Sequence, residues 1–501
     1  MSLLVPGNLG DVLTTQFHYR GRGTPARWIL RPVTVRRFPS VIIRFLASKS
    51  ISLMLFGRSE LKRLALILAL FCAGLLVGCG GSAPSNQQML SGVKFRAFVS
   101  NPLQPVATGG GTPVINIVDA AKDVLSFARI SLAATNVQFP GMMQLSPNRQ
   151  LTVVYDPDSN NLVTISNPSE AQLTGAGGNT LSSVALPGFS ESMFVWIDSA
   201  TAFAAIPSAA VLAGAPGLVD RINLATATVS AQIPVPAAHF IVQSHSGNTI
   251  LALSDTTGAV TAIFPSLIGT NQSGSAIVPV ECGSGVTDCF DHPVWAVFSS
   301  DDNTAYIFEC GPQCNGTAAA VTVLDMTASP PTIGTRIAVD GATYGMLSGT
   351  TLYVAGTPES GSNSCAGTST SASSCGRLDL VDTATLAVTS SAVITDGYHN
   401  RMELGANGQL FVGAHNCTNI NISGGEVRGC LSIFNTANSR VVVPPEIGDV
   451  TGIAPIATRN VVYVCQGGAL RIFDTTTDTL QANQVNIIGQ ATDVKLIDAA
   501  P

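Results

Sequence analysis

The sequence is poor in charge and in aromatic residues. Charged residues make up 11% of the 501 positions and aromatic residues 6%. Disorder usually requires high net charge and low hydrophobicity, so this composition argues for a folded chain. The 48 glycines and 28 prolines, with abundant Ser, Thr, Ala and Val, predict many short strands joined by turns.

Motifs of catalysis are missing as well. The segment nearest to a G-x-S-x-G nucleophile elbow, Gly188–Ser192, lacks the second glycine. The chain contains no H-E-x-x-H and no Gly-rich phosphate loop. The sequence therefore predicts no catalytic residue, no metal site and no cofactor.

Basic charge is scarce beyond the first 78 residues. Residues 1–78 hold eleven basic and two acidic residues, which leaves 14 basic and 29 acidic residues, a net charge of −15, in the rest. Such a domain repels nucleic acid and anionic headgroups, so nucleic acid is excluded as a partner.

An export signal precedes this acidic part. Arg58, Lys62 and Arg63 lead into the apolar run 64–76, which is too short to span a membrane comfortably. The tetrad Leu76-Val77-Gly78-Cys79 resembles the bacterial lipobox. The resemblance implies cleavage before Cys79 and a lipid on its sulfur. An uncleaved N-terminal anchor is the alternative.

The signal divides the chain into four parts. Met54 is a plausible natural start, which makes 1–53 a mis-annotated or dispensable extension, or else a basic cytoplasmic one. Residues 54–78 are the signal peptide, 79–92 the lipidated Cys79 and a flexible tether, and 93–501 the folded domain. By analogy with Gram-negative sorting, the absence of Asp after Cys79 favours the outer membrane, with the lipid as the only membrane contact.

One sequence motif recurs along the folded domain. It consists of a strand of alternating apolar residues, then Asp or Asn, then small polar residues, then another strand. The copies lie at 114–127, 321–334, 378–390, 431–442 and 470–481. The side chain of the Asp or Asn closes a tight turn by accepting a backbone N–H two residues on. The residues predicted as turn formers are Asp119, Asp325, Asp382, Asn435 and Asp474.

Two further strands precede each copy of the motif, which gives a unit of four strands, a to d. This unit recurs about every 42 to 57 residues. This period is typical of β-propeller blades. Seven units fill 142–492. The three strands within 93–141 and a lone inner strand at 493–498 make an eighth blade from both chain ends. The sequence thus predicts an all-β, eight-bladed propeller, with seven blades as the alternative.

The recurring motif also resembles the YVTN-type propeller repeat, in which a strand ending in Asp precedes a Thr-rich turn. The resemblance covers most of 94–498, is degenerate in each copy, and implies the fold rather than an activity.

Nine cysteines follow Cys79, and an exported domain is expected to form disulfides. Sequence proximity predicts the pairs Cys282–Cys289, Cys310–Cys314, Cys365–Cys375 and Cys417–Cys430. Cys465 is left as a buried thiol. Metal binding is the rival interpretation, but the spacing does not match zinc sites. All four pairs fall in loops that reach one face of the disc.

Four histidines are expected around the channel mouth on that face. His239, His292 and His399 each precede an inner strand, and His415 ends a strand b. They are candidate binding residues, or else scattered loop residues.

Three functions stay open from the sequence. The first is a binding or scaffold module in the cell envelope, a monomer with an envelope protein or a glycan as partner. The second is a hydrolase- or lyase-like enzyme that uses the channel mouth. The third is a purely structural envelope protein.

Overall fold

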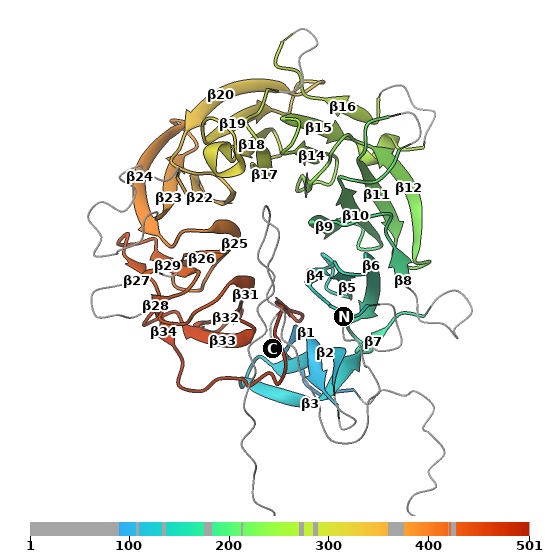
Figure 1. The fold of residues 1–501 in the computed structure, drawn as a ribbon, viewed down its shortest axis with the longest axis vertical. Helices are drawn as coiled ribbons and strands as arrows, with labels where there is room; N and C mark the ends of the chain where they lie inside the picture. Colours follow the sequence, from blue (N-terminus) through green and yellow to red (C-terminus); the bar gives the residue numbers. More distant parts are fainter. Residues whose placement is uncertain are drawn as a thin grey trace, which may run out of the picture. The chain divides into compact units, whose positions relative to one another are not determined.

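The computed structural model describes residues 90–106, 110–132, 137–174, 183–211, 214–269, 275–283, 289–358, 375–418, 420–421 and 427–499. The sequence-predicted extension, signal peptide, Cys79 and nearly all of the tether lie outside these residues. The described residues form an eight-bladed β-propeller of antiparallel sheets (Figure 1). Each blade runs from an inner strand a to an outer strand d.

The first four blades follow the chain from residue 142. Blade 1 has β4 (Met142–Leu145), β5 (Leu151–Asp156), β6 (Asn161–Ser166) and a fourth strand divided into β7 (Ala171–Gln172) and β8 (Ser183–Ala185). Blade 2 has β9 (Ser192–Val195), β10 (Thr201–Ile206), β11 (Leu218–Asn223) and β12 (Thr228–Pro234). Blade 3 has β13 (Phe240–Gln243), β14 (Ile250–Ser254), β15 (Ala259–Ile263), the short helix η1 (Pro265–Leu267) and β16 (Ile277–Pro279). Blade 4 has β17 (Pro293–Phe298), β18 (Thr304–Glu309), the short helix η2 (Gly311–Cys314), β19 (Ala320–Asp325) and β20 (Thr332–Ala338).

The remaining blades bring the chain back to its beginning. Blade 5 has β21 (Tyr344–Ser348), β22 (Thr351–Gly356), β23 (Gly376–Asp382) and β24 (Ala387–Ile394). Blade 6 has β25 (Tyr398–Leu404), β26 (Gln409–His415), β29 (Leu431–Asn435) and β30 (Val441–Val442), with the hairpin β27 (Ile420–Asn421) and β28 (Val427–Arg428) between its strands b and c. Blade 7 has β31 (Val450–Pro455), β32 (Val461–Gln466), β33 (Ala469–Asp474) and β34 (Thr479–Leu480). Blade 8 has β35 (Asp493–Leu496), β1 (Arg96–Pro105), β2 (Gly111–Asp119) and β3 (Val124–Ser131).

Blade 8 closes the ring as the sequence predicted. The inner strand β35 comes from the C-terminus and pairs with β1, with Val99 opposite Val494. The Arg96 guanidinium donates to both carboxylate oxygens of Asp498, at 2.8 and 3.0 Å, and lies 3.1 Å from Glu170 in blade 1. Eight blades are therefore present, and the seven-blade alternative is wrong.

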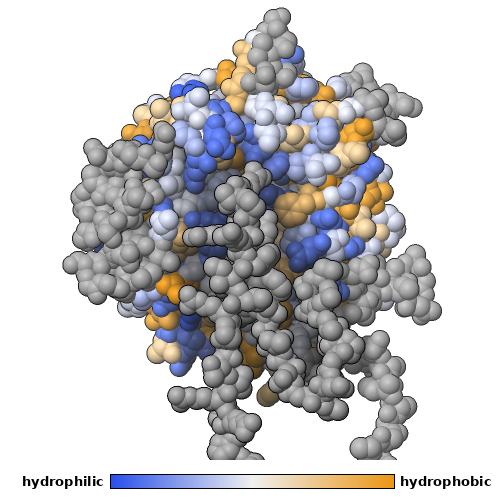
Figure 2. All heavy atoms as spheres, viewed as in Figure 1, coloured by the Kyte–Doolittle hydropathy of each residue, from blue (hydrophilic) through white to orange (hydrophobic). Residues whose placement is uncertain are grey.

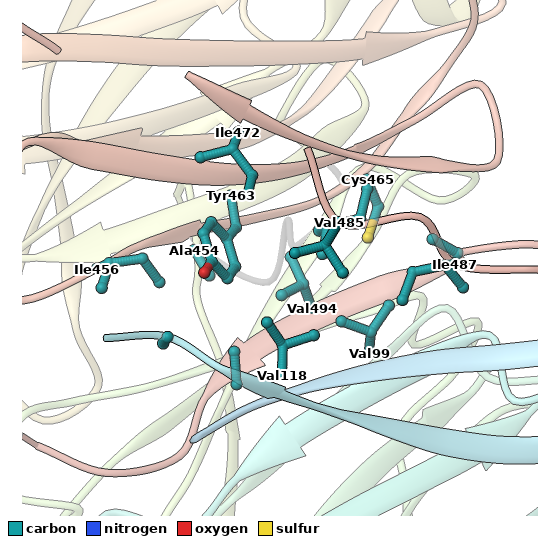
Figure 3. Close-up of a cluster of buried hydrophobic side chains, with 14 of the residues drawn as sticks. Val99, Val118, Ala454, Ile456, Tyr463, Cys465, Ile472, Val485, Ile487 and Val494 are labelled. Carbon is teal, nitrogen blue, oxygen red and sulfur yellow. The ribbon is translucent and has the colours of Figure 1, made fainter. Parts of the chain in front are cut away.

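The core lies between neighbouring sheets rather than inside them. Eight buried apolar clusters fill the eight gaps between successive blades. The cluster between blades 7 and 8 is formed by Tyr463 and Ile472 from one side and Val99, Val118 and Val494 from the other (Figure 3). Each blade therefore depends on both neighbours for its burial.

The predicted turn formers act as expected. Each carboxylate or amide oxygen accepts the backbone N–H two residues on, at 2.7 to 3.1 Å. The residues are Asp119, Asp325, Asp382, Asn435 and Asp474. All five stand at the c–d turn, where strand c ends.

A second set of buried polar side chains lies on strands b and c toward the b–c loop. Each of them holds the loop that precedes strand a of its own blade. Each binds a backbone group of that loop and so satisfies a polar atom that the core would otherwise leave unpaired. The pairs are Asp156 with Gln138 (2.6 Å), Glu309 with Asp291 (2.8 Å), Asp379 with Asp340 (2.7 Å), Ser432 with Thr395 (3.0 Å) and Gln466 with Glu446 (2.9 Å).

Removing the C-terminal strand is expected to open the ring. Deletion of residues 492–501 takes β35 away and leaves β1 with an unpaired edge and Val99 and Val118 uncovered. We expect a loss of several kcal/mol, seen as aggregation or rapid proteolysis. Deletion of residues 499–501 alone is the control and should be silent. A 492–501 deletion that melts like the full chain would contradict closure by this strand.

Asp220 of β11 is expected to destabilise the fold at high pH. Its side chain is fully buried, and Asp220 lies opposite Gln232 in the pairing of β11 with β12. Burial raises its pKa to about 6, against a smaller opposing effect of Gln232. Since the folded pKa lies above the unfolded one, stability is lost as pH rises from about 4 through about 6.

Asp220→Asn should therefore unfold at a higher urea concentration than wild type at pH 8. The gain in its free energy of unfolding should reach about 2–3 kcal/mol at that pH and vanish near pH 4. Asp325→Asn is the control of opposite sign, because hydrogen bonds from Thr327 lower the pKa of Asp325. A pH-independent gain for Asp220→Asn would show that ionisation of the carboxyl is not the cause.

Candidate functional site

Two kinds of connection share one face of the disc, here called the mouth face: the b–c loops and the d–a loops. Three predicted disulfides form in these loops, Cys282–Cys289, Cys310–Cys314 and Cys417–Cys430. Cys375 is also disulfide-bonded, whereas Cys365 lies outside the described residues. Cys465 is a buried thiol, as predicted. The covalent links restrain loops on the mouth face.

A cavity of about 530 Å³ opens at the channel mouth on this face. The described residues that line it belong to blades 1 to 6. They lie at the ends of strands b, at the starts of the inner strands and in the loops before the inner strands. The charged, imidazole and amide side chains of the lining are Glu191, His239, Asp255, Asn400, Arg401 and His415, and Ser190, Ser192 and Thr343 add hydroxyl groups. The aromatic ones are Tyr155, Phe189, Phe240, Trp295, Tyr344 and Tyr398.

His239 lies between two carboxylates. Its Nδ1 is 3.7 Å from Glu191 Oε2 and 3.6 Å from Asp255 Oδ1. Both distances exceed a hydrogen bond, and neither His239 Nδ1 nor Asp255 Oδ1 has a hydrogen-bond partner among the described residues. His239 therefore forms long ion pairs, without a hydrogen bond, with two carboxylates in the cavity lining.

The three groups shift one another's titration. Burial opposes the charged imidazolium, but Glu191 and Asp255 outweigh it and raise the pKa of His239. The imidazole of His239 in turn lowers the pKa of Glu191. Burial raises the pKa of Asp255 against the opposing effect of His239. Titratable groups with coupled, displaced pKa values in a cavity are typical of functional sites.

His415 lies on the blade 6 side of the same cavity, and the charge of Glu191 interacts with it as well as with His239. Burial lowers the pKa of His415, and its ring lies 5.1 Å from that of Tyr398, centroid to centroid. Nearby, Arg401 donates to the carbonyls of Asn400 (2.8 Å) and Thr451 (3.2 Å). The guanidinium is therefore held in place by backbone groups.

The other two predicted histidines are not among the cavity-lining residues. His292 Nδ1 lies 2.9 Å from Asp291 Oδ1, in a group that also binds Thr317 and Ala318. His399 is fully buried, and its Nε2 bonds the Thr395 carbonyl at 2.9 Å. Burial lowers the pKa of His399 to about 4. The structure thus brings together His239 and His415, whose binding role stays a prediction.

The loop that carries Glu191 is positioned by its neighbours. Tyr155, at the end of β5, accepts the Ser190 N–H at 2.8 Å. The Ser192 hydroxyl accepts the Ile241 N–H at 3.0 Å and so joins β9 to β13. Glu191 is thereby fixed between two anchored residues.

Aromatic side chains of the inner strands form one wall. Trp295 of β17 and Tyr344 of β21 stack with centroids 4.5 Å apart. The Trp295 indole N–H donates to the Gly345 carbonyl at 3.1 Å. The stacking and this hydrogen bond hold the Trp295 side chain in place. Burial raises the pKa of Tyr344 to about 12.

Sequence reasoning missed most of this lining. Glu191 precedes an inner strand as His239 does. Asp255 directly follows strand b of its blade, and His415 is the last residue of strand b in blade 6. These two points of the repeat supply most of the charged lining residues, although His292, at the first of them, is not among the lining residues. The repeat positions of Glu191 and Asp255 are thus a sequence signal for the lining that histidines alone do not give.

The rest of the described surface shows no stronger candidate. In the view of Figure 2, hydrophobic residues appear in small separate groups. Among the described residues, no group of three or more His, Cys, Asp or Glu side chains could hold a metal ion. Within the same ranges, no helix is long and apolar enough to cross a membrane.

Comparisons with known proteins show the fold alone. No family model matches the chain, and no curated protein matches it either. The structure is similar to dihydro-heme d1 dehydrogenase NirN in complex with DHE, with a TM-score of 0.56 and 10% identity over 83% of this chain and 78% of that one. A periplasmic gluconolactonase, PpgL, of Pseudomonas aeruginosa gives a TM-score of 0.42 at 14% identity, over 81% and 99% of the two chains. A functionally unknown protein from Desulfotomaculum acetoxidans gives 0.44 at 11%, over 80% and 98%.

Substituting either carboxylate should lower the pKa of His239. Glu191→Gln removes one of the two charges that favour the imidazolium, and Asp255→Asn removes the other. Histidine-selective NMR titration measures the change. Asp325→Asn, in an exposed turn of blade 4, is the control and should leave the His239 titration unchanged. A His239 titration equal to wild type in both cavity variants would contradict the coupling.

Proposed function

We propose that this chain is an exported, lipid-anchored propeller that binds a ligand in the cell envelope through the cavity at its channel mouth. The observation that carries the proposal is the cavity of about 530 Å³, whose lining combines the group Glu191, His239 and Asp255 with aromatic side chains. Ionisable groups with displaced pKa values that line a cavity are typical of binding sites.

Export and anchoring rest on the signal before Cys79 and its lipobox resemblance. The YVTN-type repeat resemblance agrees with a propeller of this kind. An acidic folded domain is consistent with a protein or glycan partner and not with nucleic acid.

The point where the chain enters the propeller agrees with this arrangement. Ser91 donates through its N–H (2.5 Å) and its hydroxyl (2.6 Å) to Glu170, in the c–d turn of blade 1. That turn lies on the face opposite the mouth face. The contact of Ser91 with Glu170 therefore holds the start of the folded domain on the face opposite the cavity.

A hydrolase- or lyase-like enzyme is the second candidate. The observation that favours it is the flanking of His239 by Glu191 and Asp255, because a histidine oriented by a carboxylate is a common general base. No acyl-transfer or metal motif accompanies it in the sequence, so binding is placed first.

In-cell crosslinking tests the binding face. A photo-crosslinking amino acid at Phe189, which lines the cavity and is 42% exposed, should capture a partner of the full chain. The same amino acid at the fully exposed Phe127, on the outer strand β3, is the matched control. Crosslinks at Phe127 equal to those at Phe189, or none at Phe189, would contradict the assignment.

The anchor is tested in the same cells. Cys79→Ser should move the protein out of the membrane fraction, because the lipid is its proposed attachment. Unchanged fractionation and unchanged lipid labelling would rule out lipidation without affecting the crosslinking result.

A further inference from the structure

The mouth cavity is lined by aromatic and polar side chains together. Blades 3 to 5 contribute aromatic rings from consecutive inner strands: Phe240 on β13, Trp295 on β17 and Tyr344 on β21. Polar side chains come from the loop before β9 and from blades 3 and 6, where Phe189 and Tyr398 also line the cavity. A ligand that fills the cavity therefore meets both aromatic rings and hydrogen-bonding groups.

From this arrangement we propose that the cavity binds a neutral carbohydrate, with a sugar ring packed on the Trp295–Tyr344 pair. The proposal rests on the proposed function and specifies the ligand of the same site. One face of a sugar ring presents C–H groups, which pack against the negative face of an aromatic ring, while its hydroxyls point outward to polar groups.

The aromatic wall is built in advance of binding. Trp295 and Tyr344 stack on one another, and the Trp295 indole is tied to the Gly345 carbonyl. A ring that is already fixed loses little side-chain entropy when a ligand packs on it. Trp295 and Tyr344 also line a second cavity of about 330 Å³.

The polar lining residues offer both donors and acceptors. The carboxylates of Glu191 and Asp255 accept, the guanidinium of Arg401 donates, and the amide of Asn400 can do both. Each sugar hydroxyl can donate and accept, so it suits such a mixed set.

Charge does not favour an ionic ligand. The carboxylates of Glu191 and Asp255 face the imidazole of His239, and the same cavity contains the guanidinium of Arg401. Opposite charges therefore balance within the lining. An anion would meet two carboxylates and a cation would meet the guanidinium, whereas a neutral hydroxyl can bond to either kind of group.

Binding by the full chain, in detergent, is tested first on a glycan array and then by calorimetry with maltose, lactose and chitobiose. We expect at least one neutral sugar to bind with a Kd below about 1 mM. Trp295→Leu should weaken that binding by about tenfold or more, because it removes the platform. Trp196→Leu is the matched control, because Trp196 donates to Gly247 and is not among the cavity-lining residues.

Fluorescence gives a second readout that does not depend on the Leu variant folding. A sugar packed on Trp295 should change the indole emission of wild type, and Trp295→Phe should keep the binding but lose the change. Absence of binding by every sugar on the array would overturn the proposal, as would equal affinities of Trp295→Leu and Trp196→Leu. If Phe189 still captured a partner in cells, the binding function would stand and only the carbohydrate class would fall.

Discussion

The antiparallel pairing of β35 with β1 is the contact on which the whole ring depends. A propeller sheet buries its faces only against its two neighbours, so a missing inner strand exposes apolar side chains on both sides. Val494 belongs to the cluster shared with blade 7, and Ile497 to the cluster shared with blade 1. Asp493 adds a polar link, because its carboxylate accepts the Met143 N–H of β4 at 2.8 Å.

A closed ring gives the mouth face a rigid base. Buried side chains such as Glu309 and Asp379 bind the loops entering their blades, and disulfides restrain others. Asp220 is an exception to this pattern, since it lies buried opposite Gln232 in the pairing of β11 with β12.

The ionisable side chains at the mouth are held differently from the buried side chains that fasten loops. In the core, polar groups such as Asp156 find backbone partners, whereas His239 and Asp255 face each other beyond hydrogen-bonding distance. Neighbouring residues hold the loop of Glu191, as Tyr155 holds Ser190. A binding site requires side chains whose positions are fixed by their neighbours.

The sequence by itself determined the repeat, the turn formers such as Asp474, the closure by residues near 494 and three disulfide pairs. These are local or periodic features: alternation marks a strand, an Asp before small polar residues marks a turn, and short cysteine spacing limits the partners. Only the tertiary structure decided which side chains share the cavity. His239 and Glu191 meet there although 48 positions separate them, while His399 turns into the core. The period of a propeller fixes the end of a strand, but the direction of a side chain at that end depends on the packing of the neighbouring blade.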